Sequence, residues 1–306
     1  MTGVGVDVSA IEPCGFCTGV RIAVEKARKV LSSKSKAYCL HLLVHNEEVV
    51  GELRRGGMVF VDSLEDVPRG ATIMFSAHGV PPDARRIAAE RGLEVVDATC
   101  PFVDRAHREV RAFAEQGLPV VVVGHSGHVE VEGLVAEYLH AAGEGGHGMV
   151  EVALGANDVA QISFADGSRV GMVCQTTLSE LQIDETIAAM RRRWPYIVEV
   201  PSSASCTATR DRQRAVRDFV LAAGEGAGVL VVGSGSSSNT LRLAEVAAAA
   251  GARTWRIDGP DEIDECDFEG IAKLGVAAGA STPKGTAMEV CAVLRRGDAY
   301  MRKGTD

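Results

Sequence analysis

Short runs of β-branched residues alternate with longer amphipathic segments along the chain, and this alternation constrains the fold more than any other feature. The strand-like runs include residues 4–8, 120–123, 229–232 and 273–277, and helical spacing marks residues 20–31, 102–116, 180–193 and 210–223. Strands that alternate with helices form α/β units with mostly parallel sheets. Ligands of such units gather at the carboxyl ends of the strands, so the residues that follow each strand-like run are the first candidates for function.

A weak internal repeat becomes visible when three of the eight cysteines are aligned. Cys17, Cys100 and Cys206 each follow a strand-like run and stand directly before a helical segment. Each of those segments leads to a further strand that ends in polar residues, at 44–46, 124–130 and 233–239. We therefore predict three small α/β domains, residues 1–100, 101–205 and 206–306, and we expect that the N-terminal strand could pack in the third domain.

Charge and hydropathy exclude several classes of protein. The chain has 41 acidic and 32 basic residues and a net charge of −9, whereas a nucleic-acid binder needs a basic surface. No apolar run reaches the roughly 18 residues that a membrane span needs, and the first 17 residues lack the basic start of a secretory signal. We therefore expect a cytoplasmic protein with reduced thiols and with no nucleic-acid or membrane partner.

The placement of the three cysteines has more than one interpretation. Thiolates at helix N-termini are favoured by the helix dipole, and three that converge would hold a soft metal centre with one position open to substrate. Unrelated buried cysteines are the simpler explanation, because such wide spacing forms no motif. The pair Cys14 and Cys17 forms a C-x-x-C, which is typical of a redox dithiol or half of a zinc site, but the chain has no second C-x-x-C.

Polar residues at the ends of the strand-like runs form a second group of candidates. The histidines His45, His78, His125 and His128 stand in tight turns and could donate hydrogen bonds to an anion, whereas we expect His107, His140 and His147 on the surface. Glu130 follows His128 by two residues, so the two side chains share a face if the segment is extended, and Glu130 becomes a candidate proton donor. The run GSGSSSN, at residues 233–239, and the turn Gly279 to Ser281 each precede a helical segment and suit phosphate oxygens.

Together these segments resemble the hydroxymethylbutenyl diphosphate reductase (LytB/IspH) family. The matching segments follow the family order from residue 15 to about residue 283: GFCTGV around Cys17, VHN around His45, FSAHGV around His78, DATCP around Cys100, GHSGHVEVEG around His128 and Glu130, QTTLS around Thr176, CTAT from Cys206, SSN from Ser237 to Asn239, and GAS ending at Ser281. Each segment is weak alone, but nine in order are highly specific.

The resemblance implies a trefoil of three α/β domains, with pseudo-threefold symmetry around a central [4Fe–4S] cluster. Cys17, Cys100 and Cys206 would be the three ligands and one iron would stay open. The substrate diphosphate would be held by His45, His78, His128, Ser237, Ser238, Asn239 and Ser281. Glu130 would supply protons, and Thr176 would orient Glu130 and the substrate hydroxyl.

The reaction implied is a reductive dehydroxylation of 4-hydroxy-3-methylbut-2-enyl diphosphate to isopentenyl and dimethylallyl diphosphate. This is the last step of the non-mevalonate pathway, with electrons from ferredoxin or flavodoxin. Cys14 stands where the family usually has Arg, Val129 stands where it has Pro, and Glu47 and Glu48 follow the VHN segment. These departures leave two alternatives open: a divergent paralogue that acts on a related diphosphate, or a non-catalytic iron–sulfur redox sensor. Quinolinate synthase also has a three-cysteine cluster, but the His, Glu and Ser set argues against it.

Overall fold

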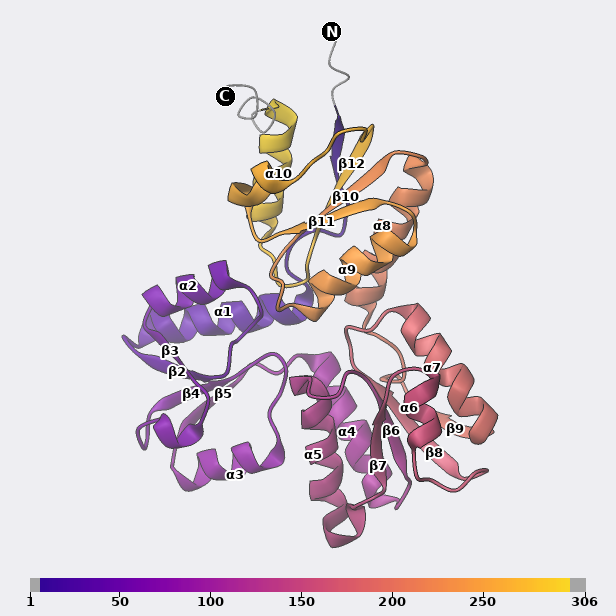
Figure 1. Ribbon diagram of the computed structural model, residues 1–306. Coiled ribbons are helices and arrows are strands. Elements are labelled where there is room, and N and C mark those ends of the chain that lie inside the picture. Colours follow the sequence, from indigo (N-terminus) through magenta and orange to yellow (C-terminus); the bar gives the residue numbers. More distant parts are fainter. Residues whose placement is uncertain (1–5, 298–306) are drawn as a thin grey trace. The chain divides into compact units, whose positions relative to one another are not determined.

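Three parallel four-stranded sheets with helices between their strands make up the computed structural model, which describes residues 6–297 (Figure 1). The α/β class predicted from the alternation is confirmed. The chain divides into two compact units. Unit 1 consists of Met1–Thr18, His45–Val49 and Thr207–Asp306, and unit 2 of Gly19–Val44 and Val50–Cys206. The three domain boundaries predicted above stay a prediction.

Unit 2 contains two sheets, with the strand orders β3-β2-β4-β5 and β7-β6-β8-β9. The strands are β2 (Ala37–Leu40), β3 (Met58–Val61), β4 (Thr72–Phe75), β5 (Glu94–Asp97), β6 (Val120–Val123), β7 (Val150–Ala153), β8 (Arg169–Cys174) and β9 (Tyr196–Glu199). Between or before them run α1 (Thr18–Ser33), α2 (Glu47–Arg55), α3 (Pro82–Glu90), α4 (Pro101–Glu115), α5 (Val129–Ala142), α6 (Ala156–Gln161) and α7 (Glu180–Arg193), with short 3₁₀ turns η1 (Leu64–Asp66) and η2 (Gly143–Gly146). The first residue of α1 and residues 47–49 of α2 belong to unit 1.

Unit 1 contains the third sheet, with the order β1-β12-β10-β11. Its elements are β1 (Asp7–Ala10), α8 (Thr207–Ala223), β10 (Ala227–Val232), α9 (Ser238–Ala249), β11 (Arg253–Ile257), η3 (Pro260–Glu265), β12 (Lys273–Ala278) and α10 (Lys284–Arg296). The strand expected at residues 4–8 is observed from Asp7, and its first two residues lie outside the described part. In Figure 1 the indigo β1 lies beside β12, with which it pairs in parallel.

All three sheets share one strand order, which explains the internal repeat. In unit 2 the first strand after each cysteine-led helix, β2 or β6, is flanked by the second and third strands of its sheet, and the fourth strand, β5 or β9, is the far edge. The third sheet follows the same order when β1 takes the place of the fourth strand. Each fourth strand is followed by one of the cysteines Cys17, Cys100 and Cys206 and then by a helix. The cysteine placement at strand-to-helix junctions is therefore confirmed.

Each sheet is covered by helices, and the alternation of its side chains shows which helix packs on which face. In β10, Leu230 and Val232 join the apolar cluster that includes α10, whereas Val229 and Val231 join the cluster formed with α8 and α9. The valines of β6 divide in the same way between α4 and α5 on one face and α6 and α7 on the other. Parallel strands buried on both faces explain why these runs are continuously apolar rather than alternating.

A glycine in β12 provides a test of this packing. A Cβ at Gly275 would lie 2.6 Å from both Ile11 Cδ1 and Phe219 Cε1, so Gly275→Ala should lower the free energy of unfolding by about 1–3 kcal/mol. The matched control is Gly285→Ala in α10, because a Cβ there meets no atom within 4 Å. The control should leave stability unchanged or raise it by roughly 0.5 kcal/mol. Urea midpoints of the two variants and the parent decide the matter, and equal midpoints would contradict the packing described.

Candidate functional site

Each of the three predicted cysteine ligands lies at the start of a helix. Cys17 directly precedes α1, Cys100 is the N-cap residue of α4, and Cys206 directly precedes α8. Cys17 belongs to unit 1, whereas Cys100 and Cys206 belong to unit 2. Within residues 6–297, neither unit by itself brings three or more His, Cys, Asp or Glu side chains together in a group that could hold a metal ion. The ligand set therefore stays a prediction.

Cys100 has surroundings that suit a thiolate bound to a soft metal. A Cβ at Gly19, in the first turn of α1, would lie 2.5 Å from Cys100 Sγ, so only glycine lets the sulfur approach that helix so closely. The sulfur thus lies against the first turn of α1 and at the start of α4, where backbone N–H groups and helix dipoles favour negative charge. The thiolate chemistry of Cys100 and its place beside two helix N-termini fit an iron–sulfur cluster.

Cys14 lies beside a carboxylate. Burial raises the pKa of its thiol, and the nearby carboxylate of Glu12 raises it further. Glu12 is held beside it, since the backbone N–H of Cys14 donates to Glu12 Oε2 at 2.7 Å and Lys284 Nζ donates to Glu12 Oε1 at 2.9 Å. A thiol with a raised pKa is a poor nucleophile and a poor metal ligand, which argues against the redox-dithiol interpretation of the C-x-x-C.

Glu130 and Thr176 are brought together in unit 2, as the predicted roles require. The backbone N–H of Thr176 donates to Glu130 Oε1 at 2.8 Å, and its hydroxyl donates to Glu130 Oε2 at 3.0 Å. Glu130 is only 2% exposed. Burial raises its pKa to about 7, because the charged form is poorly solvated, although the two hydrogen bonds from Thr176 and the charge of His107 act in the opposite direction. The result is a carboxyl that both holds and releases a proton near neutral pH.

The segment around His128 corrects one step of the sequence argument. The shared face of His128 and Glu130 was inferred for an extended segment, but His128 is the N-cap of α5 and Glu130 lies in the first helical turn. His128 Nδ1 accepts a hydrogen bond from the backbone N–H of Glu130 at 3.2 Å. With Nδ1 as acceptor the proton of the neutral ring resides on Nε2, so Nε2 is a hydrogen-bond donor, as anion binding requires.

Unit 1 gathers the other predicted diphosphate ligands at the carboxyl ends of neighbouring strands. Ser237 is the N-cap of α9 after β10, and its hydroxyl accepts from the backbone N–H of Thr240 at 3.4 Å. Asn239 Oδ1 accepts from the N–H of Ala280 at 3.0 Å, in the turn after β12. The hydroxyl of Ser281 donates to the backbone carbonyl of His45 at 2.9 Å. Polar groups from three separate segments are therefore linked at one sheet edge.

The histidines of the predicted set are divided between the two units. His45 belongs to unit 1, and burial lowers the pKa of its imidazole. His78 and His128 belong to unit 2, where His78 lies in the turn that follows β4. The structure thus groups His45 with Ser237, Ser238, Asn239 and Ser281 in one unit, and His78, His128, Glu130 and Thr176 in the other.

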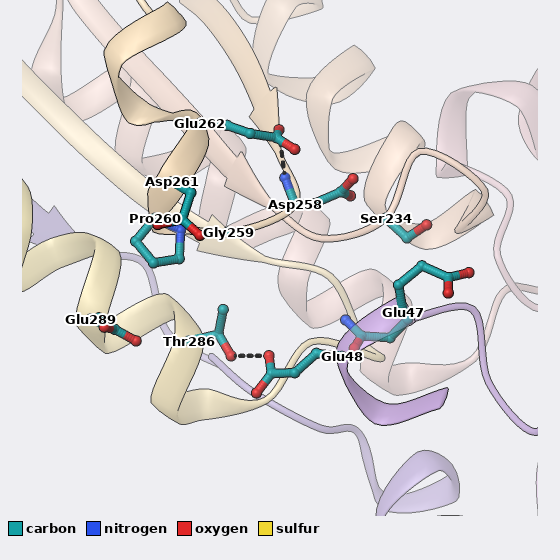
Figure 2. Close-up of a pocket in the computed structure, with 11 residues that line it drawn as sticks. Glu47, Glu48, Ser234, Asp258, Gly259, Pro260, Asp261, Glu262, Thr286 and Glu289 are labelled. Atoms are coloured by element: carbon teal, nitrogen blue, oxygen red, sulfur yellow. Dashed lines mark hydrogen bonds between the residues drawn. The ribbon is translucent and has the colours of Figure 1, made fainter. Parts of the chain in front are cut away.

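A cavity of about 320 Å³ in unit 1 is excluded as the diphosphate site by its charge. Figure 2 shows its lining, in which six carboxylates dominate: Glu47, Glu48, Asp258, Asp261, Glu262 and Glu289. Glu48 accepts from the Thr286 hydroxyl at 2.6 Å, and Glu262 accepts from the backbone N–H of Asp258 at 3.0 Å. A phosphate group would be repelled there. None of the predicted diphosphate ligands lines this cavity.

Sequence reasoning missed a buried ionisable pair beside the acid. His107, which we expected on the surface, is only 6% exposed, and its Nδ1 lies 3.2 Å from Oε2 of the equally buried Glu137. The missed signal is helical spacing, because His107 falls on the face of α4 that also carries Val103, Val110 and Phe113.

No helix in the described part of the chain is long and apolar enough to cross a membrane.

Comparison with known proteins gives one consistent result. The family model described as LytB protein matches residues 8–295. A 4-hydroxy-3-methylbut-2-enyl diphosphate reductase of Acidithiobacillus ferrooxidans is 38% identical over 95% of this chain and 89% of its own length. One from Mycobacterium bovis is 42% identical over 89% of this chain and 79% of its own length.

Solved structures agree with these sequence relatives. The E-1-hydroxy-2-methyl-but-2-enyl-4-diphosphate reductase of Plasmodium falciparum superposes with a TM-score of 0.87 at 29% identity, covering 94% of this chain and 88% of that one. A second structure, of (E)-4-hydroxy-3-methyl-but-2-enyl diphosphate reductase, has a TM-score of 0.67 at 30% identity. The match covers 95% of this chain and 99% of that one. On this sequence and structural evidence, the chain belongs to the LytB family.

Proposed function

We propose that this protein reduces 4-hydroxy-3-methylbut-2-enyl diphosphate to isopentenyl and dimethylallyl diphosphate, the last step of the non-mevalonate pathway. Family membership and relatives of that name along nearly the whole chain support this proposal. The observation that carries it is Glu130, a buried carboxyl held by two hydrogen bonds from Thr176, with a pKa raised by burial to about 7. The reaction replaces a hydroxyl by hydrogen and consumes two electrons and two protons, so it needs such an acid.

Glu130 acts on the leaving group in this proposal. A hydroxyl leaves poorly as hydroxide and readily as water, so its oxygen must gain a proton while the C–O bond breaks. Protonated Glu130 gives that proton and becomes a carboxylate, which the N–H and hydroxyl of Thr176 then stabilise at 2.8 and 3.0 Å. Thr176 also orients the substrate hydroxyl toward the acid.

In this proposal the protein binds the substrate mainly through its diphosphate group. His45, His78, His128, Ser237, Ser238, Asn239 and Ser281 would donate hydrogen bonds to its oxygens. The N-terminus of α9, which Ser237 caps, adds the positive end of a helix dipole. Burial lowers the pKa of His45, and an anion placed beside that ring raises its pKa again, so diphosphate binding and proton uptake by His45 favour each other.

Cys17, Cys100 and Cys206 would hold the iron–sulfur cluster that enzymes of this family contain. A bound [4Fe–4S] cluster with three cysteine ligands supplies electrons singly and keeps one iron open to substrate. The approach of Cys100 Sγ to the first turn of α1 at Gly19 supports that assignment. Ferredoxin or flavodoxin would deliver the two electrons one at a time.

Turnover of the proposed substrate is the first test. The protein is purified without oxygen, its cluster is rebuilt, and reduced viologen is supplied with 4-hydroxy-3-methylbut-2-enyl diphosphate. We expect viologen oxidation with both five-carbon diphosphates as products, measured by absorbance and chromatography. An intact cluster without turnover would overturn the proposal and point to a related diphosphate or to a sensor.

The ligand set is tested by single serine substitutions. Cys17→Ser, Cys100→Ser and Cys206→Ser should each lose most of the about four irons per chain that a [4Fe–4S] cluster holds, because each removes one of three ligands. Cys14→Ser is the matched control and should keep full iron, since its thiol has a raised pKa. Iron and sulfide analysis of the four variants measures how much cluster each one holds. Loss of iron in the Cys14 variant alone would contradict the assignment.

The acid is tested by a pair of neutral substitutions in the first turn of α5. Glu130→Gln keeps size and burial but removes the transferable proton, so kcat should fall by about 10²–10⁴ with little change in KM. Glu132→Gln changes an exposed carboxyl two residues away and should leave kcat unaltered. Iron content must be equal in both variants.

The parent enzyme should also show the titration of Glu130. Only the protonated form donates, and its pKa is raised to about 7, so kcat is highest below that pH and falls about tenfold per unit above it. A kcat that rises through pH 7 would contradict the role of Glu130 as acid.

A further inference from the structure

His107 lies on α4 in unit 2, buried next to an anion. Its Nδ1 is 3.2 Å from Glu137 Oε2, and Glu137 Oε1 in turn accepts from Arg111 Nε at 2.8 Å. Burial raises the pKa of Glu137, but the hydrogen bonds from His107 and Arg111 outweigh this and leave the pKa lowered, so Glu137 is a carboxylate. Among the hydrogen bonds of residues 6–297, the buried Nε2 of His107 has no partner.

Two glycines show where that nitrogen lies. A Cβ at Gly79, in the turn after β4, would be 3.3 Å from His107 Nε2, and a Cβ at Gly133, in α5, would be 3.4 Å from it. The imidazole therefore fills the space that side chains at these two positions would occupy. Gly133 follows Glu130 by three residues and precedes Glu137 by four, so all three share one face of α5. The ring lies against Gly133, which stands between Glu130 and Glu137 in the sequence of α5.

A polar cavity of about 190 Å³ leads from the surface to this ring. Its rim carries the exposed charged side chains of Arg85, Asp104 and Arg108. Its inner wall includes His107, Glu137 and Gly79. Glu130 does not line it and is 2% exposed. His107 thus stands between a cavity that water can enter and a buried acid.

We propose that His107 is a proton-relay residue that reloads Glu130 from this cavity after each turnover. The inference rests on the proposed function of Glu130 as proton donor. The ring moves so that Nε2, which is buried in this structure, takes up a proton from the cavity water. After the ring returns, the imidazolium passes this proton from Nε2 to the Glu130 carboxylate, directly or through one water. The ring ends the cycle with as many protons as it began with, Glu130 gains one proton and no electrons move.

Glu137 determines which ring nitrogen of His107 carries the transferred proton. A carboxylate at Nδ1 keeps a proton on that nitrogen, so Nε2 is the basic atom that accepts and releases the transferred proton. The same carboxylate stabilises the imidazolium during the transfer, and Arg111 holds the carboxylate in place. Support comes from Gly133, which contacts the ring and follows Glu130 by three residues on the same face of α5.

The relay is tested by chemical rescue in the holoenzyme. His107→Ala enlarges the polar cavity and removes the relay, so kcat should fall about 10- to 100-fold with KM unchanged. Free imidazole should restore kcat several-fold, whereas triazole, which is far less basic, should not. His140→Ala, an exposed histidine on α5, is the control and should neither lose activity nor respond to imidazole. Equal kcat in the His107 variant and the parent would overturn the proposal.

A second measurement needs no substrate. Infrared spectroscopy follows the Glu130 carboxyl band after a rapid pH jump, with the band assigned from Glu130→Gln. The band should respond at least tenfold more slowly in His107→Ala than in the parent, and Glu137→Gln, which keeps the ring, should be intermediate. An unchanged response in both variants would overturn the relay even if His107→Ala folds poorly. A slowed response in a protein without reductase turnover would overturn the proposed function and leave the relay intact.

Discussion

The parallel pairing of β6 with β8 is the interaction on which the chemistry of unit 2 depends. The register joins Val123 to Cys174, so both strands end at the same level of the sheet. α5 then starts at Val129, and the turn after β8 presents Thr176. Two segments that are 46 residues apart in the chain therefore meet through two hydrogen bonds between Thr176 and Glu130. A shift of the strands by one residue would exchange the two faces of the sheet and separate them.

Burial of Glu130 destabilises its charged form. A rise of its pKa from 4.5 to about 7 favours the protonated form by about 3 kcal/mol. Above that pH the carboxylate must be buried, and the two donors of Thr176 offset part of the desolvation. The folded state therefore holds the proton more tightly than the unfolded state, and stability falls as pH rises from about 4.5 to about 7, then levels off.

Local pattern predicted much of the fold and part of the site. The alternation of strand and helix signals, and the position of Cys100 before an amphipathic segment, depend on neighbours in sequence. These features could be predicted from the sequence because buried parallel strands are apolar throughout and helices show a 3.6-residue period. The partnership of Glu130 with Thr176 came from the family resemblance. The helix that starts at Val129 was not predicted, because the polar run around His128 contains no strong helix signal.

The buried side of α4 could not be assigned by residue type alone. By residue type, His107 and Glu137 are both expected at the surface. Only the helical spacing of His107 with Val103 and Val110 indicates that His107 is buried. Their pairing depends on how α4 packs against α5, which is tertiary information. The same is true of Gly19 and Cys100, which are 81 residues apart but whose contact leaves no room for a Cβ.

Stability does not explain why His107 and Glu137 are buried together. The carboxylate of Glu137 loses solvation when it is buried, and replacing buried ionisable pairs by apolar side chains of similar volume is often neutral or stabilising. The surrounding core of α4 and α5 is apolar, with Val110, Leu134 and Tyr138 fully buried, so an apolar pair would fit the same layer. A polar pair at that position therefore lowers the stability of the folded state, so the reason for its presence is functional. Proton transfer to the adjacent acid is a benefit that apolar side chains cannot provide.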